Sequence, residues 1–290
     1  MALLSSLFEE GEEKKPLASF KGGIGPHLVS VIQGMDSVAE PPRWGLHVSS
    51  LLRGICPRKE FLAVVYPKHQ SSARVGSGDR ILWAMGRAAE NHCRTSYITA
   101  AYNDNSIPQP YGVWACPKCG CQAMGFRPSG PNSICICGSG GWDYQELKLE
   151  WNGVVGSPDF VLVDDVGDFH VIEFKSINTK GFAALDSAPS LEHCLQVSAY
   201  GKMLRNQGHP VRSLTVVYVC KDYMFKSPFK TFDVEVDRYN AELELMWEDA
   251  AIVTGAISTK QLPIRIPACA SPNHPRAKMC AACSLCFSLK

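Results

Sequence analysis

The chain has 290 residues, of which 46% are hydrophobic, so it can bury the core of one large domain or of one domain with a small appendage. Its formal net charge of +1 excludes a uniformly basic nucleic-acid coat, although a local basic groove is compatible with it. No apolar run has the length of a membrane span, and the beginning of the chain is too acidic for a secretory signal. We therefore expect a cytoplasmic protein with no membrane partner.

The first half of the sequence predicts a loosely ordered beginning, two helices and a cysteine-rich insert. Residues 1–45 have no hydrophobic period. Apolar residues at helical spacing predict a serine-capped helix over residues 49–67 and a second helix over residues 78–102. Residues 114–143 are rich in Cys, Gly, Pro and Ser, which is typical of a small insert held together by metal.

The second half of the sequence alternates strands and helices. Two apolar runs over residues 156–176 predict a hairpin, followed by a helix over residues 190–208, a strand over residues 213–222 and a helix over residues 237–257. This order predicts an α/β domain over residues 46–290, with a mixed sheet flanked by helices.

The charges of the predicted hairpin lie within its apolar runs rather than only in the turn. Side chains alternate between the faces of a strand, so Glu173 and Lys175 share one face, and Asp159 on the preceding strand can lie opposite them. Gly156 would let a substrate or a backbone segment come close. Carboxylates that hold Mg²⁺ or Mn²⁺, beside a lysine that orients water, suit phosphodiester hydrolysis. The alternative is an ordinary hairpin with a Glu and a Lys in solvent.

The next helix carries His193, Gln196 and Tyr200 at spacings of three and four, so these side chains share one face. Three spaced pairs thus follow one another: Gly156 with Asp159, Glu173 with Lys175, and Gln196 with Tyr200. This series resembles the RecB-like branch of the PD-(D/E)xK nucleases. The resemblance implies a restriction-endonuclease-like core.

The resemblance also implies roles for individual residues. Asp159, Glu173 and the backbone carbonyl of Phe174 would bind the catalytic divalent ion, Mg²⁺ or Mn²⁺, and Lys175 would be catalytic. The glutamine and the tyrosine of the next helix would help to hold the DNA end, and His193 would lie beside the DNA.

An upstream helix is expected to supply one more metal ligand. The family places a His or a Glu there, a few residues after a glycine. The candidates are Glu90 and His92, which point to roughly opposite sides of a helix, so only one of them can face the site. The spacing from Gly86 favours Glu90, whereas the residue type favours His92. We expect Glu90 and leave His92 as the alternative.

Thirteen cysteines in a protein expected to be cytoplasmic point to metal before disulfides. Four of them lie near the carboxyl end and could close a zinc site without further ligands: Cys269, Cys280, Cys283 and Cys286. The segment "CPRKEFL" at Cys56 resembles the first cysteine motif of RecB-like nucleases with iron-sulfur clusters, including CRISPR-associated exonucleases and the AddB nuclease subunit. That resemblance assigns a [4Fe-4S] cluster to Cys56, Cys269, Cys280 and Cys286, with Cys283 as a substitute.

The insert contains a C-x-x-C-G motif and a later C-x-C-G motif. This pattern resembles a zinc ribbon, in which glycines let the backbone turn so that its amides face the sulfurs. The expected Zn²⁺ ligands are Cys116, Cys119, Cys135 and Cys137, and Cys121 is an alternative member.

The sequence therefore predicts a metal-dependent exonuclease that acts on single-stranded DNA or DNA ends. By resemblance to CRISPR-associated and phage-encoded members, it would cut from the 5′ end and serve recombination, phage DNA metabolism or CRISPR adaptation in a prokaryotic cell or phage-infected host. Arg53, Arg58 and Lys59 are candidate phosphate contacts or else solvated helix charges. The alternative functions are a catalytically silent DNA end-binding adaptor and a structure-selective endonuclease. The oligomeric state stays open.

Overall fold

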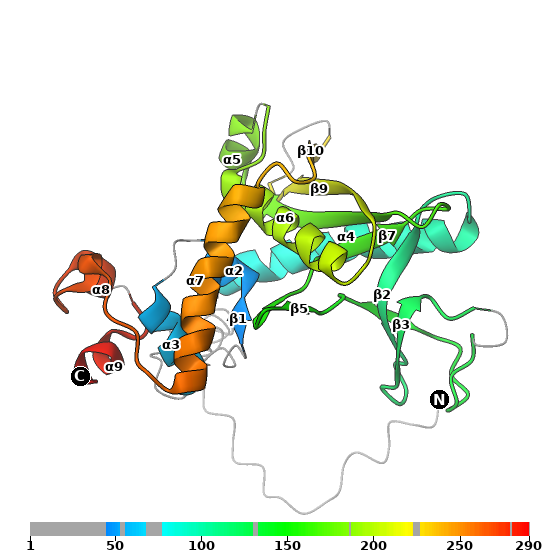
Figure 1. The fold of residues 1–290 in the computed structure, drawn as a ribbon. Coiled ribbons are helices and arrows are strands. Elements are labelled where there is room, and N and C mark those ends of the chain that lie inside the picture. The colour runs from blue at the N-terminus through cyan, green and yellow to red at the C-terminus, as the bar shows by residue number, and fades with distance from the viewer. Residues whose placement is uncertain are drawn as a thin grey trace, which may run out of the picture.

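The computed structural model describes residues 45–52, 56–67, 77–129, 133–185, 187–222, 227–278 and 280–289. Residues 1–44 of the expected lead-in and the candidate phosphate contact Arg53 lie outside the described residues. The described part contains a larger and a smaller sheet with helices packed against them (Figure 1). The predicted mixed α/β class is confirmed. Among the described helices, none combines the length and the apolar character that crossing a membrane requires.

The larger sheet mixes parallel and antiparallel neighbours. Its strands are β2 (Gln109–Ala115), β3 (Gln122–Phe126), β4 (Asp143–Gln145), β7 (Phe160–Val163), β8 (Phe169–Ile177), β9 (Val211–Cys220) and β10 (Phe229–Val234). The order is β10-β9-β8-β7-β2-β3, and β4 also pairs with β2. Only β8 and β9 run parallel. The smaller sheet has the order β1-β6-β5, from Leu46–His47, Val154–Gly156 and Leu149–Trp151.

Two helices cover opposite faces of β8. They are α4 (Ser77–Asn103) and α6 (Leu191–Asn206), and Figure 1 shows α6 in front of the sheet and α4 behind it. Lys175 of β8 contacts Gln196 of α6, whereas its neighbour Ser176 lies against Gly86 of α4, where an added Cβ would meet the serine oxygen at 2.6 Å. Consecutive strand residues point to opposite faces, so β8 lies between the two helices.

The expected single helix over residues 49–67 is wrong. The described residues form two helices, α2 (Val48–Leu51) and α3 (Pro57–Val65), and His47 rather than a serine precedes the first. Cys56 is extended, with φ −108° and ψ 101°, because the residue before a proline avoids the helical region. Pro57 then occupies the first helical position, where its missing N–H costs nothing.

The ends of the described chain meet beside α7 (Asn240–Thr259). The remaining helices are α5 (Thr179–Ala184), η4 (Pro267–Cys269), α8 (Pro275–Lys278) and α9 (Cys283–Ser288). Helix α3 packs against both α7 and α9, and Figure 1 shows α3 and α9 side by side. Only four fully buried residues form a core there, separate from the main one: Phe61, Leu62, Ala282 and Cys286. The early and late segments of the sequence are therefore joined by a small contact.

Candidate active site

The predicted acids and lysine converge at the β7–β8 hairpin. Asp159 lies one residue before β7 rather than within a strand, and its Oδ2 accepts a hydrogen bond of 2.7 Å from the backbone N–H of Phe174. Glu173 is 2% exposed, on the same face of β8 as Lys175, whose Nζ donates to Glu173 Oε1 at 2.7 Å. The pairing of the two strands thus brings the three charged side chains together.

Helix α6 holds the lysine from the other side. Lys175 Nζ donates to Gln196 Oε1 at 3.0 Å, and Gln196 Nε2 donates to the hydroxyl of Tyr200 at 3.0 Å. An ammonium has three donor protons, so the bonds to Glu173 and Gln196 leave one for a water or a phosphate oxygen. His193 does not join this chain of bonds, because its Nδ1 lies 2.7 Å from the hydroxyl of Tyr218 on β9.

Gly156 has a different purpose from the one expected. A Cβ at this position would lie 2.6 Å from a ring carbon of Tyr200 and 3.0 Å from Val48. The glycine therefore makes room for the tyrosine ring and not for a substrate. Burial, and then the charge of Glu173, raises the pKa of Tyr200 well above its usual value, so the hydroxyl stays protonated.

Helix α4 brings a further carboxylate to the site. Ligand oxygens of Glu90, Asp159 and Glu146 all lie within 4.8 Å of one another. His92, the alternative upstream ligand, is exposed. Glu146 was not predicted from the sequence, because it follows β4 at the end of the cysteine-rich insert and only the pairing of β4 with β2 brings it here.

Arg94 bridges this acidic group. Its Nη1 donates to Glu90 at 2.9 Å, to the backbone carbonyl of Asp159 at 3.0 Å and to Glu146 at 3.4 Å. The sequence analysis missed Arg94, although its spacing of four from Glu90 on a predicted helix was a usable signal.

The site has more negative than positive charge. Burial, followed by the charges of Glu173 and Glu90, raises the pKa of Asp159 well above its usual value. Burial also raises the pKa of Glu173 and of Glu146. Four carboxylates against the two cations Arg94 and Lys175 leave a formal charge of two minus, which one divalent ion would balance.

Glu173 offers an oxygen to such an ion. Its Oε2 is buried and has no hydrogen-bond partner within the described part of the chain. A buried carboxylate oxygen without a partner is costly, and hard oxygen ligands are what Mg²⁺ and Mn²⁺ prefer. The residues present therefore fit a divalent ion. The backbone of Phe174 lies beside Asp159 through its N–H, and a ligand role for its carbonyl stays a prediction.

Five cysteines gather in the insert. Ligand atoms of four lie within 4.8 Å of one another, namely Cys116, Cys119, Cys121 and Cys135. The sulfur of the fifth, Cys137, lies 3.5 Å from that of Cys116. The expected set and its alternative member are thus in one place, and the compact group contains Cys121 instead of Cys137.

The backbone around these sulfurs is shaped by two glycines. Gly120 and Gly138 have φ of +72° and +82°, a region that favours glycine, and their amides turn back to the carbonyls of Cys116 and Cys135. A hydrogen bond from the backbone N–H of Cys119 lowers the pKa of Cys116 to about 6. A thiol that ionises this readily is a good metal ligand.

A second group of five cysteines joins the two ends of the domain. One pocket is lined by Cys56 before α3 together with Cys269, Cys280, Cys283 and Cys286. Burial, and then the neighbouring sulfur of Cys56, raises the pKa of Cys269. The described residues do not gather these sulfurs as tightly as those of the insert. Wider spacing suits a cluster in which each thiolate binds a different iron atom.

The candidate phosphate contacts beside Cys56 differ from one another. Arg58 is 5% exposed, and its guanidinium donates to the carbonyls of Pro263, Cys286 and Leu289. It holds the last segment in place and presents no face to a phosphate, which corrects the expectation. Lys59 is exposed and pairs with Glu60 at 3.0 Å.

No protein-family model matches this chain, and no curated protein matches it. Among solved structures, SSO0001 is 14% identical with a TM-score of 0.38, over 90% of this chain and 97% of that chain. An alkaline exonuclease, LHK-Exo from Laribacter hongkongensis, is 14% identical with a TM-score of 0.36, over 62% of this chain and 70% of that chain. LHK-Exo in complex with dAMP is 13% identical with a TM-score of 0.43, over 75% and 89%. These likenesses are too distant to carry an argument about this chain.

Proposed function

We propose that this protein is a deoxyribonuclease that uses Mg²⁺ or Mn²⁺ and removes nucleotides from single-stranded DNA or from DNA ends. One observation carries the proposal: Asp159, Glu173 and Lys175 meet at a buried site that has an excess of negative charge and an unpaired carboxylate oxygen. An adaptor that only binds DNA gains nothing from burying these groups together, because their burial is costly.

The divalent ion would be held by Asp159, Glu90 and Glu146, whose ligand oxygens lie within 4.8 Å of one another, together with the unpartnered oxygen of Glu173 and the carbonyl of Phe174. Such an ion lowers the pKa of a bound water and polarises a phosphoryl oxygen. Lys175 would orient the attacking water or stabilise charge on the phosphate through its third donor proton.

The surrounding residues would position these groups. Gln196 fixes the lysine ammonium from α6, and Tyr200 in turn fixes the amide of Gln196. Arg94 offsets the repulsion between Glu90 and Glu146. These contacts let the site keep its geometry before DNA binds, which is how an enzyme reduces the cost of reorganisation during reaction.

We also propose that the terminal cysteines hold a [4Fe-4S] cluster. Soft thiolates are suitable ligands for iron-sulfur clusters, and five thiols line one pocket. The ligands would be Cys56, Cys269, Cys280 and Cys286, with Cys283 as the substitute. A cluster there would join α3 to the last segment of the domain.

The insert is proposed to bind Zn²⁺. Four sulfurs within 4.8 Å of one another support a single tetrahedral ion. The compact group favours Cys121 over Cys137 as the fourth ligand beside Cys116, Cys119 and Cys135, since Cys137 is absent from it. Zinc would act in the structure of the insert and not in the cleavage.

The test is to incubate end-labelled DNA with the anaerobically purified protein and Mn²⁺. Linear single strands labelled at the 5′ or the 3′ end report whether cleavage starts at an end and at which one. A circular single strand of the same sequence is the control, and cuts in it would favour the endonuclease. Binding without any shortening of linear DNA would contradict the nuclease and favour the adaptor.

A further inference from the structure

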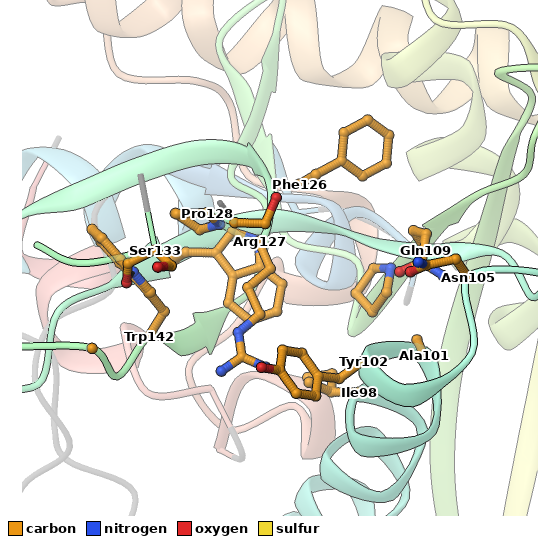
Figure 2. Close-up of a pocket in the computed structure, with 14 residues that line it drawn as sticks. Ile98, Ala101, Tyr102, Asn105, Gln109, Phe126, Arg127, Pro128, Ser133 and Trp142 are labelled. Atoms are coloured by element: carbon orange, nitrogen blue, oxygen red, sulfur yellow. Dashed lines mark hydrogen bonds between the residues drawn. The ribbon is translucent and has the colours of Figure 1, made fainter. Parts of the chain in front are cut away.

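A pocket of about 610 Å³ lies between the second half of α4, β2 and the cysteine-rich insert. Figure 2 shows Arg127 pointing toward Tyr102, whereas the ring of Phe126 is turned away from both and the side chains of Asn105 and Gln109 lie apart from this pair. The volume falls within the range of roughly 300–1,000 Å³ that ligand sites occupy. None of the candidate metal ligands lines this pocket.

The composition of the pocket favours an anion with a flat ring. Arg127 is its only charged lining residue, and no carboxylate lines it. The guanidinium lies 4.5 Å from the ring centroid of Tyr102 and 6.0 Å from that of Trp114. Within the described residues, Arg127 makes no ion pair. The cation is therefore held by aromatic faces and remains free to meet a phosphate.

Two of the aromatic rings are unusually open to solvent. Tyr102 is 68% exposed and Phe126 is 54% exposed, although large aromatic side chains are normally buried. Aromatic faces beside a cation are the platform on which single-stranded nucleic acids stack their bases. The side-chain amide of Asn105 can pair with the polar edge of a base, and so can the side-chain oxygen of Gln109, whose Nε2 donates to backbone carbonyls of the protein.

A continuous layer of rings connects the pocket to the acidic site. Trp114, at the base of the pocket, packs edge-on against Tyr144 with centroids 5.4 Å apart. Tyr144 packs in the same way against Phe160, at 5.3 Å, and Phe160 follows Asp159 in the chain. Arg94 of the acidic group lies 5.6 Å from the centroid of Tyr144. One aromatic layer therefore separates the two sites.

We propose that this pocket binds an unpaired base of the single-stranded DNA, stacked on Tyr102, with its phosphate on Arg127. The proposal rests on the proposed function, because it takes the DNA as the substrate of the neighbouring acidic site. A strand anchored here would lie one aromatic layer away from that site. The pocket would thus favour single strands over duplex, whose bases are not free to stack on a protein side chain.

Binding is measured by fluorescence anisotropy with a labelled oligo(dT) of twelve nucleotides. The full chain carries Lys175→Ala in this experiment, so that the DNA stays intact. Tyr102→Ala and Arg127→Ala are each expected to weaken binding about tenfold, the loss typical of one stacked base. Phe229→Ala and Arg212→Ala are matched controls, because both residues are exposed and lie away from the pocket, Phe229 on β10 at the opposite edge of the sheet.

An abasic version of the oligonucleotide separates stacking from charge. The chain that carries only Lys175→Ala should bind abasic DNA more weakly than oligo(dT). This loss of affinity should be about as large as the loss that Tyr102→Ala causes for oligo(dT). Tyr102→Ala should bind the two DNAs almost equally, since the stacking contact is already gone. Equal losses from Tyr102→Ala and the Phe229→Ala control would overturn the proposal. Tighter, Tyr102-dependent binding of oligo(rU) would overturn DNA as the ligand.

Cleavage assays distinguish the two proposals from each other. In the chain with Lys175 intact, Tyr102→Ala should raise KM for linear single-stranded DNA and leave kcat near that of the parent. If the parent never cleaves DNA but the pocket variants weaken binding, the nuclease is wrong and the pocket stands. If the parent cleaves and the pocket variants bind and cleave like the controls, the pocket is wrong and the nuclease stands.

Discussion

The acidic site and the two cysteine groups differ in what holds them in place. Asp159 directly precedes β7, Glu173 and Lys175 lie on β8, and Gln196, which holds the lysine, lies on α6. These three elements also supply much of the main hydrophobic core, including Val161, Val171 and Val197. The terminal cysteines adjoin a cluster of only four fully buried residues, and in the insert the fully buried side chains are few. The hydrophobic core can therefore position the acids alone, whereas the cysteine regions have little buried apolar surface, and the proposed metals would hold them in place.

The largest expected effect concerns the acidic site, which the hydrophobic core holds in place. Lys175→Ala should reduce DNA cleavage at least about a hundredfold, because a group that assists proton transfer or charge stabilisation is lost. The melting temperature should stay within a few degrees of the parent, since the fold around the site does not depend on this side chain. Lys202→Ala is the control for cleavage rate, because this partly buried lysine lies on the same helix as Gln196 and pairs with Glu244 outside the site. Equal cleavage by both variants would remove Lys175 from the catalytic group.

The next largest effect concerns the terminal cysteines. Cys56→Ala should abolish the brown colour and the blue-violet absorbance of anaerobically purified protein. It should also lower the temperature at which the contact between α3 and the last segment unfolds. Cys93→Ala is the control, because this thiol lies on α4 outside both cysteine groups. A colourless parent protein that contains about two zinc ions would replace the cluster by zinc.

Arg58→Ala should destabilise the chain-end contact by about 1–3 kcal/mol, because a buried guanidinium that bonds three carbonyls is lost, although Arg265 still donates to those of Cys286 and Leu289. Urea unfolding measures this change in free energy. Lys59→Ala, its exposed neighbour, should change it by less than about 0.5 kcal/mol. If Lys59→Ala weakens DNA binding and Arg58→Ala does not, Lys59 contacts DNA and Arg58 acts only in the stability of the chain-end contact.

Removal of the insert metal should leave the acidic site almost intact. A zinc chelator should make residues 116–141 sensitive to protease, whereas the hairpin and α6 should stay protected. Cys135→Ser should reproduce this pattern without the chelator. Because Glu146 follows the insert and belongs to the compact group with Glu90 and Asp159, its displacement should lower Mn²⁺ affinity by about threefold, while the ligands on α4 and β8 stay in place. If the chelator unfolds the whole domain, the hydrophobic core does not hold the acidic site in place without the insert metal.

The smallest effect concerns pH. Burial and mutual repulsion raise the pKa of Asp159 and Glu173, so without an ion these acids cost the folded state stability as the pH rises through their raised pKa values. An ion removes this cost and competes with protons. Mn²⁺ should therefore raise the melting temperature by about 5 °C near pH 8 and by less near pH 5.5. Glu173→Gln should shrink the difference, and an equal rise at both pH values would contradict the coupling.

Periodicity and spacing located the elements that build the acidic site. Alternation over residues 156–176 placed Glu173 and Lys175 on one strand face, and helical spacing placed Gln196 and Tyr200 on one helix face. The single helix over residues 49–67 failed because Pro57 sets its own helix start, and a proline signal in the sequence was available for it. Local patterns thus worked wherever one element carried the whole signal.

What the sequence by itself determined is the set of chemically distinctive groups: acids and a lysine inside apolar strands, a polar helix face and two sets of cysteines. The tertiary structure alone decided which of these meet. It placed Glu90 rather than His92 beside Asp159, brought in Glu146 and Arg94, buried Arg58 against the last segment and opened a pocket beside Tyr102. The physical reason is that strand pairing and helix packing join residues far apart in the chain, and neither leaves a period in the sequence.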